Sequence, residues 1–142
     1  MADYSAGGRA YDHAVLIDET GASISATNPI PVTSEGTDPL EHTFTQLTAP
    51  GSTTGFATAG RNNHSVFLTV AAIDTTVVVR IEGSADNSAW ANLDISGLDS
   101  TLTANGTYLF AIPETPMAYI RVTFVSETGG TAATIDAKYV GH

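Results

Sequence analysis

The sequence contains no cysteine in its 142 residues, and charged residues make up only 14% of it. Without cysteine, disulfide-stapled scaffolds, thiol enzymes, zinc ribbons and iron–sulfur proteins are excluded. Lysine and arginine together number five, against 15 aspartates and glutamates, so the formal net charge is −10. Because nucleic acids and anionic membranes are bound largely through lysine and arginine, the sequence predicts neither kind of partner. A chain of this length can bury roughly 70% of its unfolded surface, which is enough for one core without staples.

Long apolar runs and the motifs of common enzyme classes are also missing. No run approaches the ~20 apolar residues of a transmembrane helix. The first residues lack the basic and apolar regions of a signal peptide, so we expect synthesis in a cytoplasm. The motifs of zinc peptidases, P-loop enzymes, serine hydrolases and dinucleotide-binding enzymes do not occur. The sequence therefore predicts a protein that is not an enzyme, with no catalytic residue, no cofactor and no bound metal.

Two acidic features leave narrower alternatives open. The loop 84–88 offers side-chain oxygens from Ser84, Asp86 and Asn87, and a weakly bound Ca²⁺ takes oxygens of this kind. We favour the competing interpretation, a solvated turn whose Asp and Asn bond their own backbone. A carboxylate pair for glycoside hydrolysis also stays open, because loops can bring two acids together from any sequence separation. No two acids stand out as candidates for such a pair.

Small residues take the place of the missing charges, since the sequence has 21 Thr, 11 Ser, 20 Ala and 13 Gly. Apolar and polar residues alternate in runs that are rich in β-branched side chains and separated by Gly, Asn, Asp and Pro. These runs cover residues 64–70, 75–81, 107–112, 117–125 and 131–140. The period-two pattern predicts an all-β fold, a single antiparallel β-sandwich of the jelly-roll or immunoglobulin-like type.

Turn residues between the runs predict how the strands are joined. Asp74 and Thr75 lie between two runs and indicate a short turn, so we expect 64–70 and 75–81 to form a hairpin. Asn105 and Gly106 are typical of a tight hairpin turn that leads into Thr107. The segment 38–48 allows two interpretations. Asp38, Pro39 and Glu41 fit the start of a helix, whereas the three threonines in 43–48 favour a strand, which is the interpretation we prefer.

The charge and the turn residues are concentrated near the start of the chain. Residues 1–41 carry a net charge of −6, while residues 42–142 carry only −4. Glycine and proline are also frequent in the first forty residues, and this composition favours extended chain over a compact unit. We therefore divide the chain into an extended N-terminal arm, 1–40, and a β-sandwich body, 41–142. The arm offers apolar and proline side chains as a candidate interface with a neighbour: Tyr4, Tyr11, Val15, Ile17, Ile30, Pro31 and Val32.

Trp90 is the only tryptophan and follows the second predicted strand. A single tryptophan at the end of a strand most often buries its large surface in the core. We therefore interpret Trp90 as a core anchor. The alternative is an exposed side chain that stacks on a sugar ring.

Several stretches together resemble small β-sandwich proteins of tailed bacteriophages, in particular capsid decoration (cement) proteins. The stretch 77–90 (VVVRIEGSADNSAW) matches their pattern of strand, Gly-Ser, Asp and Trp, and 119–124 followed by 129–131 is similar to their closing hairpin. The stretches 17–21 (IDETG) and 28–32 (NPIPV) resemble their N-terminal lead-in. The pattern around Trp90 also resembles discoidin-like sugar-binding domains.

This resemblance implies a virion structural protein made in the host cytoplasm and placed on the outer surface of the capsid. It would be a homo-oligomer, with a trimer expected, that bridges subunits of the major capsid protein and stabilises the shell without catalysis. A neck, tail or fibre component of the phage is the nearest alternative. A carbohydrate-binding β-sandwich module is the other, and it would require an exposed Trp90 or Tyr108.

Overall fold

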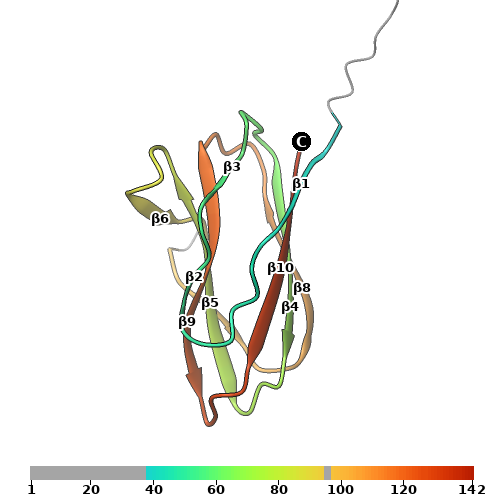
Figure 1. The fold of residues 1–142 in the computed structure, drawn as a ribbon, viewed down its shortest axis with the longest axis vertical. Coiled ribbons are helices and arrows are strands. Elements are labelled where there is room, and N and C mark those ends of the chain that lie inside the picture. The colour runs from blue at the N-terminus through green and yellow to red at the C-terminus, as the bar shows by residue number, and fades with distance from the viewer. Residues whose placement is uncertain (1–37, 95–96) are drawn as a thin grey trace, which may run out of the picture. The chain divides into compact units, whose positions relative to one another are not determined.

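The computed structural model describes residues 38–94 and 97–142 (Figure 1). Within these ranges the regular structure consists of strands, with no helix. The strands are β1 (Leu40–Thr43), β2 (Gly51–Ser52), β3 (Phe56–Ala57), β4 (His64–Ala71), β5 (Thr76–Ser84), β6 (Trp90–Asn92), β7 (Ser100–Leu102), β8 (Gly106–Ile112), β9 (Tyr119–Thr128) and β10 (Thr134–Gly141).

The candidate interface residues of the arm lie outside the described residues: Tyr4, Tyr11, Val15, Ile17, Ile30, Pro31 and Val32. Leu40, the last residue that we assigned to the arm, is the first residue of β1 and pairs with Gly141. In the segment 38–48, β1 and a bridge from Leu47 to Ile135 take the place of a helix. The helix interpretation is therefore wrong. The strand is displaced from the predicted stretch 43–48, of which Thr43 lies in β1 and Leu47 in the bridge.

The strands form two antiparallel sheets that face each other across the core (Figure 1). The four-stranded sheet has the order β1-β10-β4-β8. The second sheet has the order β2-β9-β5-β6, with β3 also on β9 and β7 also on β5. The predicted all-β fold, a single antiparallel sandwich, is confirmed.

The pairing follows a nested pattern along the chain. β1 pairs with β10, β2 and β3 pair with β9, β4 pairs with β8, and β5 pairs with β6 and β7. The chain is thus one long antiparallel hairpin that is rolled up, with its tip at residues 85–89. This arrangement is that of a jelly roll, and it decides between the two sandwich types that the sequence left open.

Three predicted hairpins are wrong, because the chain changes sheet at each of those turns. β4 belongs to the four-stranded sheet and β5 to the other, so 64–70 and 75–81 face each other instead of pairing. The turn at Asn105 joins β7 to β8 across the sheets, and the turn at Gly129 joins β9 to β10 in the same way. The alternating pattern identifies the buried face of a strand but not its partner, which is why these turns were misassigned.

The turn from β4 to β5 and the turn from β7 to β8 are hydrogen-bonded to each other at one end of the sandwich. The Ile73 N–H donates to the Asn105 side-chain oxygen over 2.9 Å. Ala72, in the first crossing, has a φ of 59°, and Gly129, in the third, has a φ of 92°. Backbone in this left-handed region turns the chain sharply enough to leave one sheet and enter the other.

The core is built from the inward-facing residues of both sheets, as the alternating patterns predicted. Residues two apart on one strand point to the same face, so each long strand contributes three or four side chains. The buried apolar residues are Phe44, Val66, Leu68, Val70, Val77, Val79, Ile81, Leu102, Ile112, Ile120, Val122, Phe124, Ala133, Ile135, Ala137 and Tyr139.

One polar group inside this core is fully hydrogen-bonded. The His64 ring is buried, with Nε2 2.8 Å from the Thr115 carbonyl oxygen and Nδ1 2.9 Å from the Tyr139 hydroxyl. A carbonyl oxygen can only accept, so Nε2 carries the proton and Nδ1 accepts from Tyr139. The neutral ring is thereby satisfied on both sides, and burial lowers the pKa of His64. His64 therefore ties β4 to β10 and to the loop after β8.

Candidate functional site

The outer edge of β8 is the longest unpaired strand edge in the described part of the chain. β8 has seven residues, none of them charged and none of them proline. The other edges are short: β6 and β7 have three residues each, and β2 and β3 have two each. β1, at the far side of the same sheet, has four residues and a Glu41–Lys138 ion pair of 3.0 Å. Because natural proteins usually shorten or charge a free edge, β8 stands out as a surface for pairing.

The register fixes which backbone groups of β8 are free. Leu47 and Ile135 exchange both backbone hydrogen bonds, so Ile135 directs its N–H and C=O toward β1. These directions alternate along each strand, and the pairing of β10 with β4 and of β4 with β8 has no register shift. By this alternation, Gly106, Tyr108 and Phe110 hydrogen-bond to β4. The N–H and C=O groups of Thr107, Leu109 and Ala111 are therefore directed away from β4. A new strand would hydrogen-bond to these three residues.

Two large apolar side chains lie on the outer face of the four-stranded sheet beside this edge. Phe67 is directly opposite Leu109 in the register, and the two are 40% and 57% exposed. Their neighbours on the same two strands are polar or small, since Thr69 and Thr107 join through their hydroxyls over 2.9 Å. An exposed apolar pair on an otherwise largely polar face, beside a free edge, is a feature of contact surfaces.

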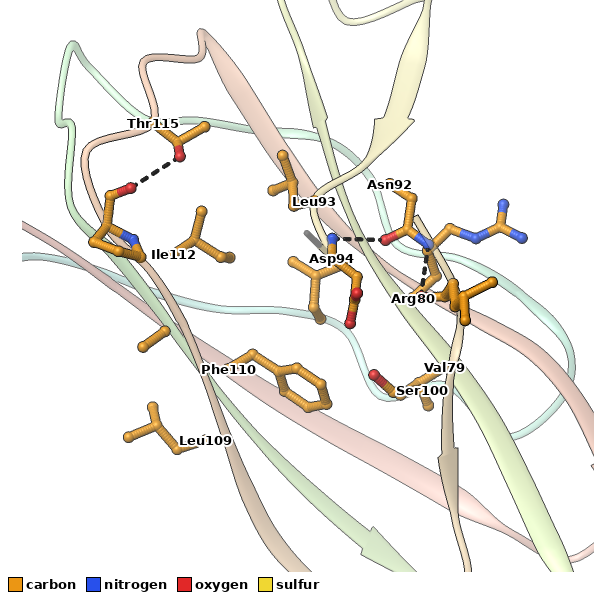
Figure 2. A pocket seen from close by; sticks show the side chains of 14 residues that line it. Val79, Arg80, Asn92, Leu93, Asp94, Ser100, Leu109, Phe110, Ile112 and Thr115 are labelled. Atoms are coloured by element: carbon orange, nitrogen blue, oxygen red, sulfur yellow. Dashed lines mark hydrogen bonds between the residues drawn. The ribbon is translucent and has the colours of Figure 1, made fainter. Parts of the chain in front are cut away.

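A cavity of about 490 Å³ opens on the inner side of the same edge, between β8 and the β6–β7 connection (Figure 2). Figure 2 shows Phe110 directed into this space, whereas Leu109 points to the other side of the strand. Leu93 and Ile112 also line the cavity, and Leu98, at its border, is 67% exposed. Apolar side chains therefore flank β8 on both the outer and the inner face of the four-stranded sheet.

An ion pair holds the β6–β7 connection at the border of this cavity. Arg80 Nε and Nη2 donate to the two carboxylate oxygens of Asp99 over 2.6 and 2.9 Å. These hydrogen bonds lower the pKa of Asp99 and raise that of Arg80. Asn92 Nδ2 adds hydrogen bonds to Asp99 and to the Leu98 carbonyl, of 3.2 and 3.1 Å. A two-pronged pair of this kind fixes Asp99, just before β7, beside β5.

The structure places Trp90 outside the hydrophobic core, which corrects the core-anchor interpretation. Trp90 is half-buried, and its register partner is Ser84, which lies on the outer face of β5. The Arg121 guanidinium lies 4.2 Å from the centroid of the Trp90 ring. Gly55 packs against the ring edge so closely that a Cβ atom there would be 2.6 Å from Trp90 Cη2. Arg121 and Gly55 thus cover Trp90 on the face of the six-stranded sheet.

Arg121, which covers Trp90, also binds the buried carboxylate of Glu82. Arg121 Nε donates to Glu82 Oε2 over 3.0 Å, Thr123 donates its hydroxyl to the same oxygen, and Arg80 lies 3.8 Å from Oε1. A carboxylate that is paired with two arginines has its charge neutralised in place. This network joins β5 to β9, and its geometry suits structure rather than proton transfer.

The loop 84–88 forms the turn that we favoured from the sequence. Asp86 Oδ1 accepts from the N–H groups of Ser88 and Ala89 over 2.9 Å each, and Asp86 also bonds the hydroxyls of Ser84 and Ser88. These hydrogen bonds lower the pKa of Asp86 to about 2. The carboxylate therefore closes the tip of the rolled hairpin. In the described ranges, no three His, Asp or Glu residues gather as metal ligands would.

The remaining sequence candidate, Tyr108, is half-buried on the inner side of β8, and its hydroxyl donates to the Ala104 carbonyl over 2.6 Å. The sequence reasoning did not single out Phe67, Leu98 or Leu109 as contact residues. One signal was present: Phe67 occupies the face of its strand on which Ser65 and Thr69 are polar.

Among the described residues, no helix is long and apolar enough to cross a membrane.

Comparison with known proteins gives a likeness in fold. The crystal structure of the SPBc2 prophage-derived protein YomS is similar, with a TM-score of 0.52 and 12% identity, over 73% of this chain and 95% of YomS. A low-affinity xylan-binding module, CBM86, from the gut symbiont Roseburia intestinalis matches 73% of this chain and 94% of that one, with a TM-score of 0.34 and 10% identity. No protein-family model matches the chain, and no curated protein does.

Proposed function

We propose that this protein is a non-enzymatic structural component of a tailed-phage virion, and within the virion a decoration protein that stabilises the capsid. The observation that carries the proposal is the uncharged edge of β8, with Phe67 and Leu109 exposed on one side and an apolar cavity on the other. Such an edge is suited to a protein partner, because it combines free backbone groups with apolar side chains. The prophage origin of YomS agrees with the phage resemblance of the sequence.

The proposed mechanism is repeated binding. A homo-oligomer, with a trimer expected, would span junctions between subunits of the major capsid protein on the outer surface of the shell. Each contact can be modest, because many contacts act together over one shell and the linked sites reinforce each other. This role is binding alone, so it needs no catalytic group. A body with few charges and a Thr-rich surface is compatible with it.

Co-sedimentation with capsids tests the proposal. Purified protein is mixed with shells assembled from the major capsid protein of the phage that encodes it, and the shells are pelleted. We expect saturable binding to the shells and a higher temperature of shell disruption. Protein that stays in the supernatant, or that binds isolated tails and not shells, contradicts the capsid assignment.

The double variant F67S/L109S provides the matched probe of the edge, and T101S on β7 of the other sheet provides the control. Phe67 and Leu109 are exposed, so we expect the fold to tolerate both serines. Weakened shell binding by F67S/L109S, with T101S unchanged, supports the role of the edge. Equal binding by both variants contradicts it.

A further inference from the structure

The edge of β8 is matched by a segment of the chain's own sequence. We propose that residues 29–32 (Pro-Ile-Pro-Val) of a second copy of this chain add to β8 as an antiparallel strand. The proposal rests on the homo-oligomer of the proposed function but not on its capsid partner. It names both the site of self-association and the segment that fills it.

The alternation of proline in this segment fits an edge strand. Residues two apart in a strand direct their N–H groups to the same edge and their side chains to the same face. Ile30 and Val32 can therefore both donate to β8, while Pro29 and Pro31, which have no N–H, both face away from it. The segment pairs along one edge only. Its proline edge then ends the sheet and stops further addition.

The side chains of the segment match the surfaces beside β8. The free backbone groups belong to Thr107, Leu109 and Ala111, whose side chains lie on the outer face of the sheet. Directly paired residues place their side chains on the same face. Ile30 and Val32 would thus lie beside the exposed Leu109, and the proline rings would cover the cavity side of the edge.

Chain connectivity assigns the segment to a second copy. Leu40, Gly141, His64 and Ile112 form one row across the sheet, so the described chain begins at the end where β8 finishes. A strand antiparallel to β8 would leave Val32 at least about 25 Å from Asp38 of the same chain, given strand spacings of ~4.8 Å and ~3.4 Å per residue. The six residue steps between them span at most about 22 Å. These lengths favour another molecule as the source of an antiparallel strand on β8.

Charge favours the same contact. Each chain carries a net charge of −10, so two copies repel each other over most of their surface. Neither β8 nor residues 28–32 contain a charged side chain. The proposed contact brings together two neutral stretches, one from each copy. If each arm reaches the next body in turn, the contacts close into a ring such as a trimer.

Disulfide trapping tests the proposal on the full-length protein, which has no cysteine of its own. Leu109→Cys, carrying a mass tag, is mixed with untagged Ile30→Cys or Val32→Cys and oxidised mildly. We expect a disulfide-linked tagged–untagged dimer for at least one of the two pairs. Docking raises the effective thiol concentration to the mM range, so linkage should be roughly 1,000-fold faster than for undocked thiols at μM concentration.

Ala57→Cys on β3 is the matched control, because Ala57 is exposed on an edge of the other sheet. We expect no rapid linkage between Ala57→Cys and either arm variant. A chain that carries both Val32→Cys and Leu109→Cys separates the two origins of the arm. Linkage between molecules supports the proposal, whereas linkage only within one molecule, or none for either pair, overturns it.

Two proline variants test the hydrogen-bonding pattern without changing the body. Ile30→Pro with Val32→Pro removes both donors that face β8, and we expect the oligomer to dissociate. Pro29→Ala with Pro31→Ala leaves those donors in place, and we expect association to persist. The opposite pattern overturns the proposal. Because trapping needs no capsid, its failure alongside successful shell binding would reject this contact and leave the proposed function standing.

Discussion

At the scale of single residues, hydrogen bonding decides what the polar side chains do. His64, Glu82 and Asp86 each have hydrogen-bond partners on neighbouring residues. A buried polar group in such a setting fixes the positions of its neighbours, and its loss leaves them unsatisfied. These residues therefore maintain the body, and their effects are to be sought in stability.

His64 makes the stability of the fold depend on pH. Its pKa in the folded state lies below the ordinary value of 6.5, so the unfolded chain binds the proton more readily. The free energy of unfolding should therefore be constant above pH 6.5 and fall as the pH drops from 6.5 toward the folded-state pKa. His42, whose pKa is also lowered by burial, contributes with the same sign. Urea unfolding between pH 8 and pH 5 measures the effect.

The variant Tyr139→Phe tests the hydrogen bond to His64, and His64→Gln tests the contribution of His64 to the pH dependence of stability. Tyr139→Phe removes the donor to Nδ1 and should cost about 1–3 kcal/mol at pH 8, because a buried acceptor is left unsatisfied. His64→Gln should leave a smaller pH dependence, due to His42. An unchanged pH dependence in His64→Gln would show that His64 does not titrate as argued.

Gly55 tests the position of Trp90. A Cβ atom at residue 55 would lie 2.2 Å from Asn87 Oδ1 and 2.6 Å from Trp90 Cη2, while a Cβ atom at Gly51 meets nothing closer than 3.9 Å. Gly55→Ala should therefore displace the ring, lower stability by about 1–3 kcal/mol and shift the tryptophan fluorescence. Gly51→Ala is the control and should leave the fluorescence unchanged. Equal spectra for the two variants would contradict the packing of Trp90 on Gly55.

At the scale of elements, one hairpin tip organises the whole fold. β5 and β6 pair locally across residues 85–89, and every other pair in the nested pattern joins strands that are further apart in the sequence. Forming this tip first would bring the next pairs into reach, because closing a short loop has a low entropic cost. Asp86 is the residue that holds the tip closed.

Asp86→Asn should therefore weaken the hairpin tip. The pKa of Asp86 in the folded state is about 2, below its ordinary value of 3.8, so the charged carboxylate stabilises the fold. This stabilisation is present above pH 3.8 and is lost as the pH falls from 3.8 to about 2. The variant should unfold at a lower urea concentration than the wild type at pH 7, with a smaller difference at pH 2. A constant difference at both pH values would contradict the role of the charge.

At the scale of the whole molecule, the uncharged edge of β8 on a strongly acidic chain predicts self-association. Three chains of 14.7 kDa give a particle of about 44 kDa. We expect native mass spectrometry or light scattering to find this mass at micromolar concentration. We expect F67S/L109S to lower it while leaving the urea midpoint of the body nearly unchanged, since both side chains are exposed. A wild-type protein that stays at 14.7 kDa would contradict the oligomer.

The strands that carry the candidate site could be predicted from the sequence, but the site itself could not. The runs at 64–70 and 107–112 were predicted as strands, and their alternation identified the buried faces correctly. That Phe67 and Leu109 lie opposite each other depends on the pairing of β4 with β8, which are separated by β5, β6 and β7 in the chain. Trp90 was misassigned for a related reason, because its face follows from its pairing with Ser84.

The sequence by itself determined the fold class, most strand positions, the inward-facing residues and the turn at Asp86. Each of these follows from local physics: period-two burial, β-branched side chains and short-range hydrogen bonds. Only the tertiary structure decided which strands pair, where the chain changes sheet, and that β8 is left as a free edge. The physical reason is that pairing satisfies backbone groups between distant segments, and the alternating pattern of one strand is compatible with many partners.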